Sequence, residues 1–399
     1  MTDAFEMLDE SPDTIVAFGE GCFTQFAAFA EEEAVSKILV VTGGNSADKN
    51  GAWQNLLASA ACMSIEISRH SGVRPEPDTE DVMKIHASMA ALEPDLIVAI
   101  GGGSVMDATK AAYLLYQGGG KLEDYWGLDR YSSQNPGKRL KRIVCFPTSA
   151  GTGSEATPYA NIVDRVAGVK KLIVEKEIIP GLAFLSPQLT CSMPQELTRD
   201  TACDALAHLI EGFLNVKADN AHPSANEWSL AGMRLIVKNL PRVLANGEDI
   251  KARGELLAAA CLGGMVIRYK PTSLPHLCSY SWYGRIAHGL AVAILLPHAW
   301  SYYLEESKVR ERTKELKGIF PGNSNSPQEI ISGYREFLSS CGVPESLQSI
   351  PEMNLELLER TALSASQNSM KLESAPRAVP LDKSAEILRG ILHSAWKGR

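Results

Sequence analysis

Four side chains of the kinds that bind transition metals stand in the second half of the chain. Asp204 and His208 are four residues apart in DALAH, within a segment of helical periodicity, so both project from one helix face and can reach one ion. His276 and His288 begin and end the short, nearly uncharged segment HLCSYSWYGRIAH. One carboxylate and three imidazoles suit Fe²⁺ or Zn²⁺ and leave a position for a substrate oxygen. The alternative for the Asp204–His208 pair is a hydrogen bond that bridges two helical turns, and a lone histidine is usually an ordinary core or surface residue.

Three glycine-rich loops each follow a predicted strand. They are Gly43, Gly44 and Ser46 after the strand at 37–41; Gly101, Gly102, Gly103 and Ser104 after the strand at 95–100; and TSAGTGSEAT at 148–157 after the strand at 142–149. Glycines let a backbone approach a pyrophosphate closely, and a helix N-terminus supplies free N–H groups and a positive dipole. A single loop of this kind is more often a plain turn, but three in one sheet favour a nucleotide site.

The charge of the first loop bears on the choice of cofactor. An acidic residue there would hydrogen-bond the adenosine ribose 2′-OH and repel a 2′-phosphate. The segment VTGGNS has no acid before Asp48, and its small residues with Ser46 leave room for the extra phosphate. We therefore expect NADPH rather than NADH.

The elements that must position these residues change in character along the chain. The first half alternates short β-branched runs with helical ones, which predicts a parallel, Rossmann-like sheet that binds ligands at the C-terminal ends of its strands. From about residue 188, segments such as DTACDALAHLIEGFL and AEILRGILHSAW have helical periodicity. We expect an α/β dinucleotide-binding domain over residues 1–187 and an all-α domain carrying the metal and substrate site over 188–399.

Composition narrows the class of protein. The formal charge of −8 argues against nucleic-acid or anionic-membrane surfaces, and no apolar run approaches the ~18 residues of a spanning helix. The acidic N-terminus shows no secretory signal, and the eight cysteines are spread out without a C-x-x-C pair. These features predict reduced thiols in a cytoplasmic protein.

Longer motifs carry a family resemblance. GGGSVMDATKAA, PTSAGTGSEATPYANIVD, SMPQELT, DALAHLIEGFL and HGLAVAILLPH occur in this order, and the chain resembles the iron-containing (group III) alcohol dehydrogenases over nearly its whole length. The resemblance implies a dehydroquinate-synthase-like architecture, with an α/β dinucleotide-binding domain, a helical domain and an active site between them. It also implies a homo-oligomer, dimeric or larger.

The resemblance assigns roles to individual positions. It places the metal ligands at Asp204, His208, His276 and His288, and the pyrophosphate loop at Gly101–Ser104 with Asp107 just behind it. Thr148, Thr152 and Ser154 match the hydroxyl-rich loop beside the cofactor, and Lys171 matches a lysine near the ribose. GGNSADKNG resembles the loop of the NADPH-using aldehyde-reductase branch, the butanol-dehydrogenase-like members.

The segment from His276 to His288 departs from the family pattern. Family members usually carry a second histidine where this chain has Tyr280, and the segment here is two residues shorter, so the reach of His276 to the metal depends on the shortened loop. The sequence PHLCSY resembles the phosphonoacetaldehyde-reductase-like subgroup. Arg268, Lys270 and Arg285 lie nearby and are candidates to hold a phosphonate or sulfonate head group, the alternative being solvation or pairing with acids.

The resulting hypothesis is a reversible, metal-dependent hydride transfer between NAD(P)H and a small aldehyde, such as phosphonoacetaldehyde or sulfoacetaldehyde. The metal would act as a Lewis acid, and Tyr280 is a candidate proton relay. Two alternatives stay open. One is a related enzyme such as a polyol-phosphate dehydrogenase, and the other is a catalytically retired nucleotide-binding paralogue whose site the shortened segment has broken.

Overall fold

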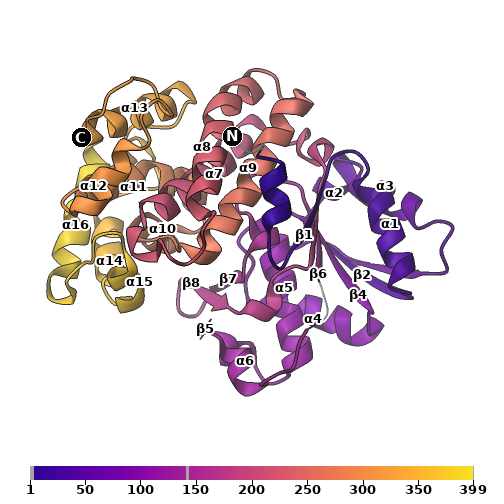
Figure 1. Cartoon of the computed structure of the whole chain (residues 1–399). Helices are drawn as coiled ribbons and strands as arrows, with labels where there is room; N and C mark the ends of the chain where they lie inside the picture. Colours follow the sequence, from indigo (N-terminus) through magenta and orange to yellow (C-terminus); the bar gives the residue numbers. More distant parts are fainter. Residues whose placement is uncertain (1–3, 141–142, 399) are drawn as a thin grey trace. The chain divides into compact units, whose positions relative to one another are not determined.

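The chain divides into two compact units (Figure 1). The computed structural model describes residues 4–140 and 143–398. The first unit comprises Met1–Pro194 with Gly247–Gly264, and the second comprises Gln195–Asn246 with Met265–Arg399. Helix α9 (Ile250–Tyr269) therefore begins in the first unit and ends in the second.

A parallel six-stranded sheet forms the centre of the first unit. Its strand order is β1-β9-β6-β4-β2-β3, and every pairing is parallel. The strands are β1 (Ile15–Phe18), β2 (Lys37–Thr42), β3 (Glu66–His70), β4 (Leu96–Gly101), β6 (Ile143–Pro147) and β9 (Leu182–Leu185). The central strands β2, β4 and β6 are rich in Val and Ile because both of their faces are buried.

Helices cover both faces of this sheet (Figure 1). Leu39, Ile97 and Cys145 point to the face covered by α4 (Thr79–Leu92) and α5 (Gly103–Gly118). Ile38, Val98 and Phe146, one residue along each strand, point to the face covered by α1 (Cys22–Glu32) and α3 (Ala52–Ser59). The alternation follows from the two-residue period of a strand, and it lets the sheet bury apolar side chains on both sides.

A second, three-stranded sheet also belongs to the first unit. Strands β7 (Tyr159–Asp164) and β8 (Val169–Val174) form an antiparallel hairpin, and β5 (Gly127–Leu128) pairs in parallel with β8. Helix α5 packs against β7. Two short helices, α2 (Ser46–Lys49) and α6 (Arg130–Gln134), complete the unit.

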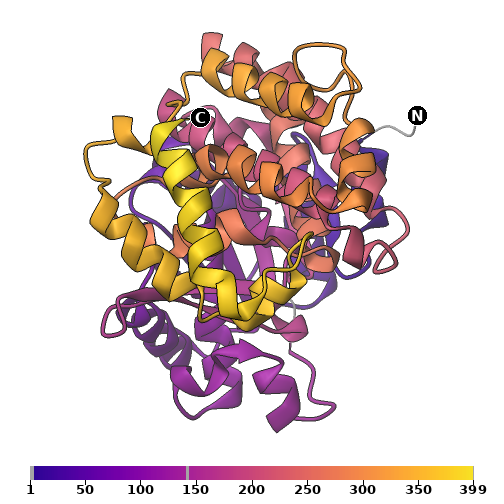
Figure 2. The ribbon, with the colours of Figure 1, turned by 90° about the vertical axis from the view of Figure 1, so that its left-hand side faces the viewer.

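The described residues of the second unit form helices and connecting loops and no strand. Its helices are α7 (Gln195–Leu214), α8 (Ala225–Ala245), α10 (Leu274–Ser279), α11 (His288–Tyr303), α12 (Ser307–Lys314), α13 (Pro327–Ser340), α14 (Leu355–Ala365), α15 (Ser369–Ser374) and α16 (Ser384–Lys397). Helix α7 packs against α8 and α11 and is buried on every side from Ala202 to Leu214. Figure 2 shows α16, in yellow, which contacts α11 and α14. A functional residue on α7 is therefore held rigidly.

Short 3₁₀ turns connect these elements. They are η1 (Glu6–Glu10), η2 (Leu122–Tyr125), η3 (Ser154–Ala156), η4 (Lys176–Ile178), η5 (Pro187–Thr190), η6 (Val216–Ala218), η7 (Tyr280–Trp282), η8 (Leu347–Ser349) and η9 (Leu381–Lys383). None of the helices in the described residues combines the length and apolarity that crossing a membrane requires.

The predicted fold class is confirmed: a parallel sheet with helices on both faces is followed by a helical region. The strand expected at 142–149 is β6, although its first residue, Arg142, lies outside the described part of the chain. Strands β3 and β9 and the β7–β8 hairpin were not identified from the sequence. The domain division at 187/188 stays a prediction.

Candidate metal centre and nucleotide-binding loops

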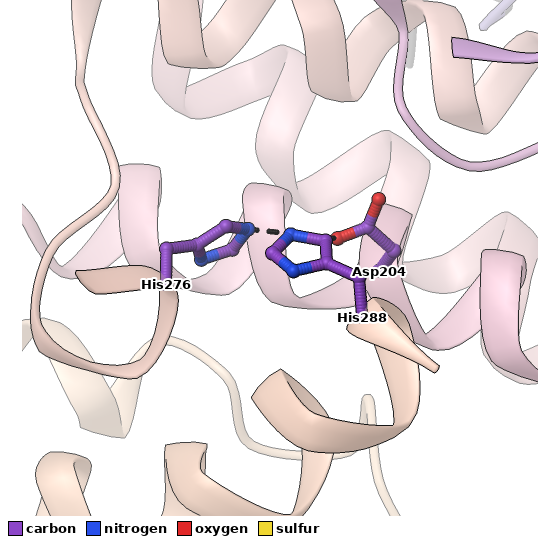
Figure 3. A group of neighbouring side chains, drawn as sticks. All are labelled: Asp204, His276 and His288. Carbon is purple, nitrogen blue, oxygen red and sulfur yellow. Dashed lines mark ion pairs between the residues drawn. The ribbon is translucent and has the colours of Figure 1, made fainter. Parts of the chain in front are cut away.

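The four side chains proposed as metal ligands meet within the second unit. Oδ1 of Asp204 lies 3.6 Å from Nε2 of His208, 3.5 Å from Nε2 of His276 and 3.6 Å from Nε2 of His288. The donor atoms of Asp204, His276 and His288 all lie within 4.8 Å of one another (Figure 3). The ring of His208 stacks on that of His276 with centroids 4.8 Å apart. One carboxylate oxygen thus faces three imidazole nitrogens.

Three elements bring these side chains together. Asp204 and His208 occupy adjacent turns of α7, His276 lies in the short helix α10, and His288 is the first residue of α11. The approach of α11 to α7 depends on Gly289, because a Cβ there would lie 1.8 Å from the carbonyl oxygen of Asp200. Only glycine lets His288 come this close to Asp204.

Hydrogen bonds on the far side of two rings orient their lone pairs. Nδ1 of His276 bonds Oε1 of Glu211. Nδ1 of His288 lies 3.1 Å from Oγ of Ser279, which itself donates to the carbonyl oxygen of His276 over 2.8 Å. In the neutral form of both rings the proton is therefore assigned to Nδ1, and the lone pair is on Nε2, the nitrogen that faces Asp204. This is the tautomer that a metal ligand needs.

Charge and burial are balanced within the cluster. Asp204, His208 and His276 are buried, whereas the side chain of His288 is 26% exposed. Burial favours the protonated form of Asp204, yet the neighbouring imidazoles hold its pKa below its ordinary value. Burial lowers the pKa of His276, but the carboxylates of Glu211 and Asp204 outweigh it and raise the pKa to about 9. The cluster is open on the side of His288, its one partly exposed member.

These residues fit a metal ion. Oδ1 of Asp204 and Nε2 of His276 are buried and make no hydrogen bond among the described residues. Buried polar atoms normally have such partners, so the pair is suited to a ligand. Ligand atoms at roughly 2.0–2.2 Å from one tetrahedral ion stand about 3.3–3.6 Å apart, which matches the three N–O separations. The nitrogen and oxygen donors are those of Fe²⁺ and Zn²⁺ sites.

Four other predicted site residues lie in the same unit. The ring of Tyr280 is nearly parallel to that of His288, with centroids 6.4 Å apart. Arg285 is exposed and precedes His288 by three residues, and Arg268 lies over the ring of Tyr269. The ammonium of Lys270 is buried and bonds Asp219 over 2.6 Å and Asn226 over 2.7 Å. Pairing with an acid, the alternative left open by the sequence, therefore describes Lys270.

The three predicted cofactor loops follow three adjacent strands of the first unit. Gly43, Gly44 and Ser46 come after β2, Gly101–Ser104 joins β4 to α5, and Thr148 follows β6. Because these strands are parallel neighbours, the loops meet at one edge of the sheet, as the sequence predicted. The third loop is joined to the second by a hydrogen bond from the Thr148 N–H to the carbonyl oxygen of Gly101 (3.0 Å).

A buried polar network holds the hydroxyl-rich loop against α5. Oγ of Ser154 donates to Asp107 over 2.7 Å, and the backbone N–H of Asn161 donates to the same carboxylate over 2.9 Å. Lys110 is fully buried, and its ammonium donates to the carbonyl oxygens of Ser154, Thr157 and Tyr159 at 2.5–3.1 Å. Asp107 and Ser154 thus brace the loop in this structure.

The remaining predicted cofactor residues lie at the edges of this region. Oγ1 of Thr152 accepts a hydrogen bond from the Ser154 N–H over 3.2 Å, and Oγ of Ser104 accepts one from the Glu76 N–H over 3.1 Å. Lys171 lies on β8 of the three-stranded sheet, beside Ile162 of β7. It is the one member of the predicted set that does not follow a strand of the main sheet.

Three residues near these sites received no role from the sequence. Glu211 lies seven residues after Asp204 on α7, a helical spacing that marks it in retrospect. Ser279 gave no signal, because its partner His288 lies nine residues away across a turn. Arg69, on β3, binds both oxygens of the Asp48 carboxylate at 2.7 Å and donates to Oγ1 of Thr42 over 3.0 Å. Its place beside the first loop depends on the pairing of β2 with β3.

Known proteins resemble the chain from end to end. Residues 13–187 match the family described as iron-containing alcohol dehydrogenase, and residues 198–392 match its C-terminal family. Long-chain-alcohol dehydrogenase 1 of Geobacillus thermodenitrificans is 30% identical over 393 residues, which cover 95% of this chain and 94% of that one. NAD-dependent methanol dehydrogenase of Bacillus methanolicus is 26% identical over 388 residues, covering 94% and 97%. The alcohol dehydrogenase from Oenococcus oeni has the same fold with a TM-score of 0.86 at 25% identity, covering 96% and 98%.

Proposed function

The chain belongs to the iron-containing alcohol dehydrogenase family and is therefore an oxidoreductase. We propose that it reversibly reduces a small aldehyde at a metal ion, which is held by Asp204, His208, His276 and His288. The observation that carries this proposal is the approach of three Nε2 atoms to Oδ1 of Asp204, each within 3.6 Å. When bound, the ion would supply Lewis acidity at a carbonyl oxygen, and the nicotinamide cofactor would supply the hydride.

The chain's own residues position the reaction and handle the proton. Asp204 and His276 are buried, so the carbonyl group must approach from the side of His288, the one exposed member. Tyr280 lies on that side with its ring against His288, which makes it the proposed relay between the alkoxide and solvent.

For the cofactor we propose NADPH. Asp48 is the first acid after the loop Gly43–Ser46, and the guanidinium of Arg69 binds both of its oxygens. The charge that would repel a 2′-phosphate is thereby neutralised, and an arginine stands within the same group. A Cβ added to Gly44 would meet no atom within 4 Å, so the loop is not crowded at this position.

For the substrate we propose an aldehyde with an anionic head, such as phosphonoacetaldehyde or sulfoacetaldehyde. Arg285 is the favoured partner for that head, because it is exposed and lies within the shortened segment that leads to His288. Arg268 is half-buried beside Tyr269, and Lys270 forms an ion pair with Asp219. The proposal therefore depends on Arg285 first.

The convergence of the four side chains also bears on the alternative of a retired paralogue. That alternative requires the shortened segment to have displaced His276, yet its Nε2 lies 3.5 Å from Asp204. The match to the alcohol dehydrogenase family over both halves of the chain favours this chemistry over that of a polyol-phosphate dehydrogenase.

The test follows NADPH absorbance in metal-reconstituted protein, with phosphonoacetaldehyde as substrate and propanal as the uncharged control. We expect a strong preference for the phosphonate, which Arg285→Ala abolishes by raising KM for the phosphonate alone. Replacing His288 with alanine should remove both stoichiometric metal and turnover and leave the fold intact. Full activity in that variant would contradict the metal centre, and equal rates with both aldehydes would contradict the anionic head.

A further inference from the structure

Glu211 stands out among the buried groups of the second unit. It lies on the same stripe of α7 as Asp204 and His208, because positions 204, 208 and 211 are four and three residues apart. Its side chain is 0% exposed. A buried carboxylate is costly unless hydrogen bonds satisfy it, so its partners indicate what it is for.

Those partners belong to the segment that carries His276. The backbone N–H of Ser273 donates to Oε2 of Glu211 over 2.7 Å, and Oγ of Ser273 lies 3.2 Å from the same oxygen. The other oxygen, Oε1, bonds Nδ1 of His276. Oγ of Ser273 also lies 2.8 Å from the hydroxyl of Tyr303, which completes the network. One carboxylate thus ties the start of α10 to α7 and binds the ring that α10 presents.

The buried cation of Lys371, which acts on Glu211 through its charge, leaves these bonds intact. The ammonium of Lys371 donates to the carbonyl oxygen and to Oγ1 of Thr272, at 2.7 and 3.1 Å. It therefore stabilises the Glu211 carboxylate through its charge and takes no lone pair from it. Oε1 of Glu211 is left to the His276 ring.

The bond to His276 has a chemical consequence at the opposite ring nitrogen. An ionised carboxylate only accepts hydrogen bonds, so the neutral His276 ring has its proton on Nδ1 and its lone pair on Nε2. That Nε2 is buried, makes no hydrogen bond among the described residues, and faces Asp204 at 3.5 Å. A carboxylate behind a metal-binding imidazole fixes its tautomer and orientation and makes it a stronger ligand.

We infer that Glu211 is a positioning residue of the metal centre, and that its carboxylate holds His276 in the tautomer and orientation that bind the ion. The inference rests on the proposed function, because it needs His276 to be a ligand. It also explains how His276 keeps its position although the segment from His276 to His288 is shortened. Glu211 and Ser273 anchor the ring from the N-terminal side, so its place does not depend on the length of the loop that follows.

The test uses Co²⁺ as a spectroscopic probe in the full chain. The Co²⁺ affinity, measured by competition with a chelator, and the visible absorption bands are compared for the wild type, Glu211→Gln and Glu155→Gln. Glu155 is the matched control, since it is also a buried glutamate but lies in the first unit. We expect Glu211→Gln to bind Co²⁺ about 10- to 100-fold more weakly, with shifted bands, and Glu155→Gln to match the wild type.

Further measurements separate this role from a structural one. A purely structural role would lower the urea midpoint of metal-free Glu211→Gln and leave the Co²⁺ bands of the folded protein unchanged, which would overturn the inference. If Glu211→Gln does not fold, Ser273→Ala serves instead, because it removes one donor to the carboxylate, and its affinity should fall severalfold. Wild-type affinity and bands in Glu211→Gln, or in Ser273→Ala where Glu211→Gln does not fold, would also overturn it. A wild type that binds no stoichiometric Co²⁺ would instead contradict the proposed function.

Discussion

The backbones of two glycines in the first unit, Gly153 and Gly264, are in close contact, which leads to a prediction about the hydroxyl-rich loop at 148–157. Gly153 precedes η3 with a φ of +59°, and Gly264 lies within α9. A Cβ on Gly264 would lie 2.3 Å from the carbonyl oxygen of Gly153 and 2.9 Å from its Cα. Ordinary contact begins at 3.4 Å, so Gly264→Ala needs the loop and the helix to separate by about 1.1 Å.

The magnitude follows from two opposing effects. Alanine is better than glycine in a helix by about 1 kcal/mol. Overpacking costs about 1–3 kcal/mol, and the upper part of this range, about 2–3 kcal/mol, applies here because the obstacle is backbone that cannot rotate away. We therefore expect Gly264→Ala to lower the free energy of unfolding by roughly 1–2 kcal/mol. If the loop yields, Thr152 and Ser154 move with it, and NADPH should bind about tenfold more weakly.

Urea denaturation and a fluorescence titration with NADPH test both consequences. Gly390→Ala is the control, because Gly390 lies exposed in α16 and an added Cβ meets no atom within 4 Å. That variant should gain about 0.5–1 kcal/mol. The reasoning is refuted if Gly264→Ala behaves like Gly390→Ala, with equal or greater stability and unchanged NADPH affinity.

Three further predictions concern the same unit. Gly44→Asp fits without a clash and places a carboxylate beside the proposed 2′-phosphate. The Kd of this variant for NADPH should therefore rise on the order of tenfold to a hundredfold, while its Kd for NADH changes little. Equal changes in the two Kd values would contradict the proposed position of the 2′-phosphate. Burial raises the pKa of Glu155 to about 7, so the native state keeps a proton that the unfolded chain releases near pH 4.3. The bound proton stabilises the native state. This contribution to the free energy of unfolding is complete below about pH 4.3 and is lost as the pH rises through about 7. Urea unfolding should show a loss of roughly 3 kcal/mol from pH 5 to pH 8 that is absent in Glu155→Gln, and parallel pH profiles of the two proteins would refute the assignment. Lys110→Met removes every hydrogen bond of the buried ammonium and should lower the free energy of unfolding, measured by the same method, by about 3–5 kcal/mol. A decrease below about 1 kcal/mol would show that the network does not brace the loop.

Much of the fold could be predicted from patterns among residues that are close in the sequence. Runs such as KILVV and DLIVAI followed by glycine loops predicted β2, β4 and their place in a parallel sheet, because strand period and turn chemistry depend on near neighbours in the chain. The i, i+4 spacing of Asp204 and His208 likewise placed both side chains on one face of α7. The pairing of β7 with β8 escaped prediction although both strands are as long as β2 and β4, because they are partly exposed and mix polar with apolar residues, so no continuous β-branched run marks them.

The roles of charged residues that depend on whether the side chain is buried could not be predicted from the sequence. In the sequence, Lys270 and Arg285 are equivalent basic residues, yet the structure buries the first against Asp219 and exposes the second. Glu211 looks like an ordinary helical glutamate until α7 is seen to be buried on all sides and Ser273 and His276 are seen to face it. Burial depends on packing by distant segments, which no local pattern encodes.

The sequence by itself therefore determined the identities of the side chains proposed to bind a metal, the strands that carry the glycine loops, and the family to which the chain is similar. Tertiary structure decided that His276 reaches Asp204 despite a shortened segment, that Glu211 holds its ring, and that Arg69 neutralises Asp48. The physical reason is that helix and strand geometry act over three or four residues, whereas these contacts join residues 21 to 72 positions apart in the chain and arise only when whole elements pack together.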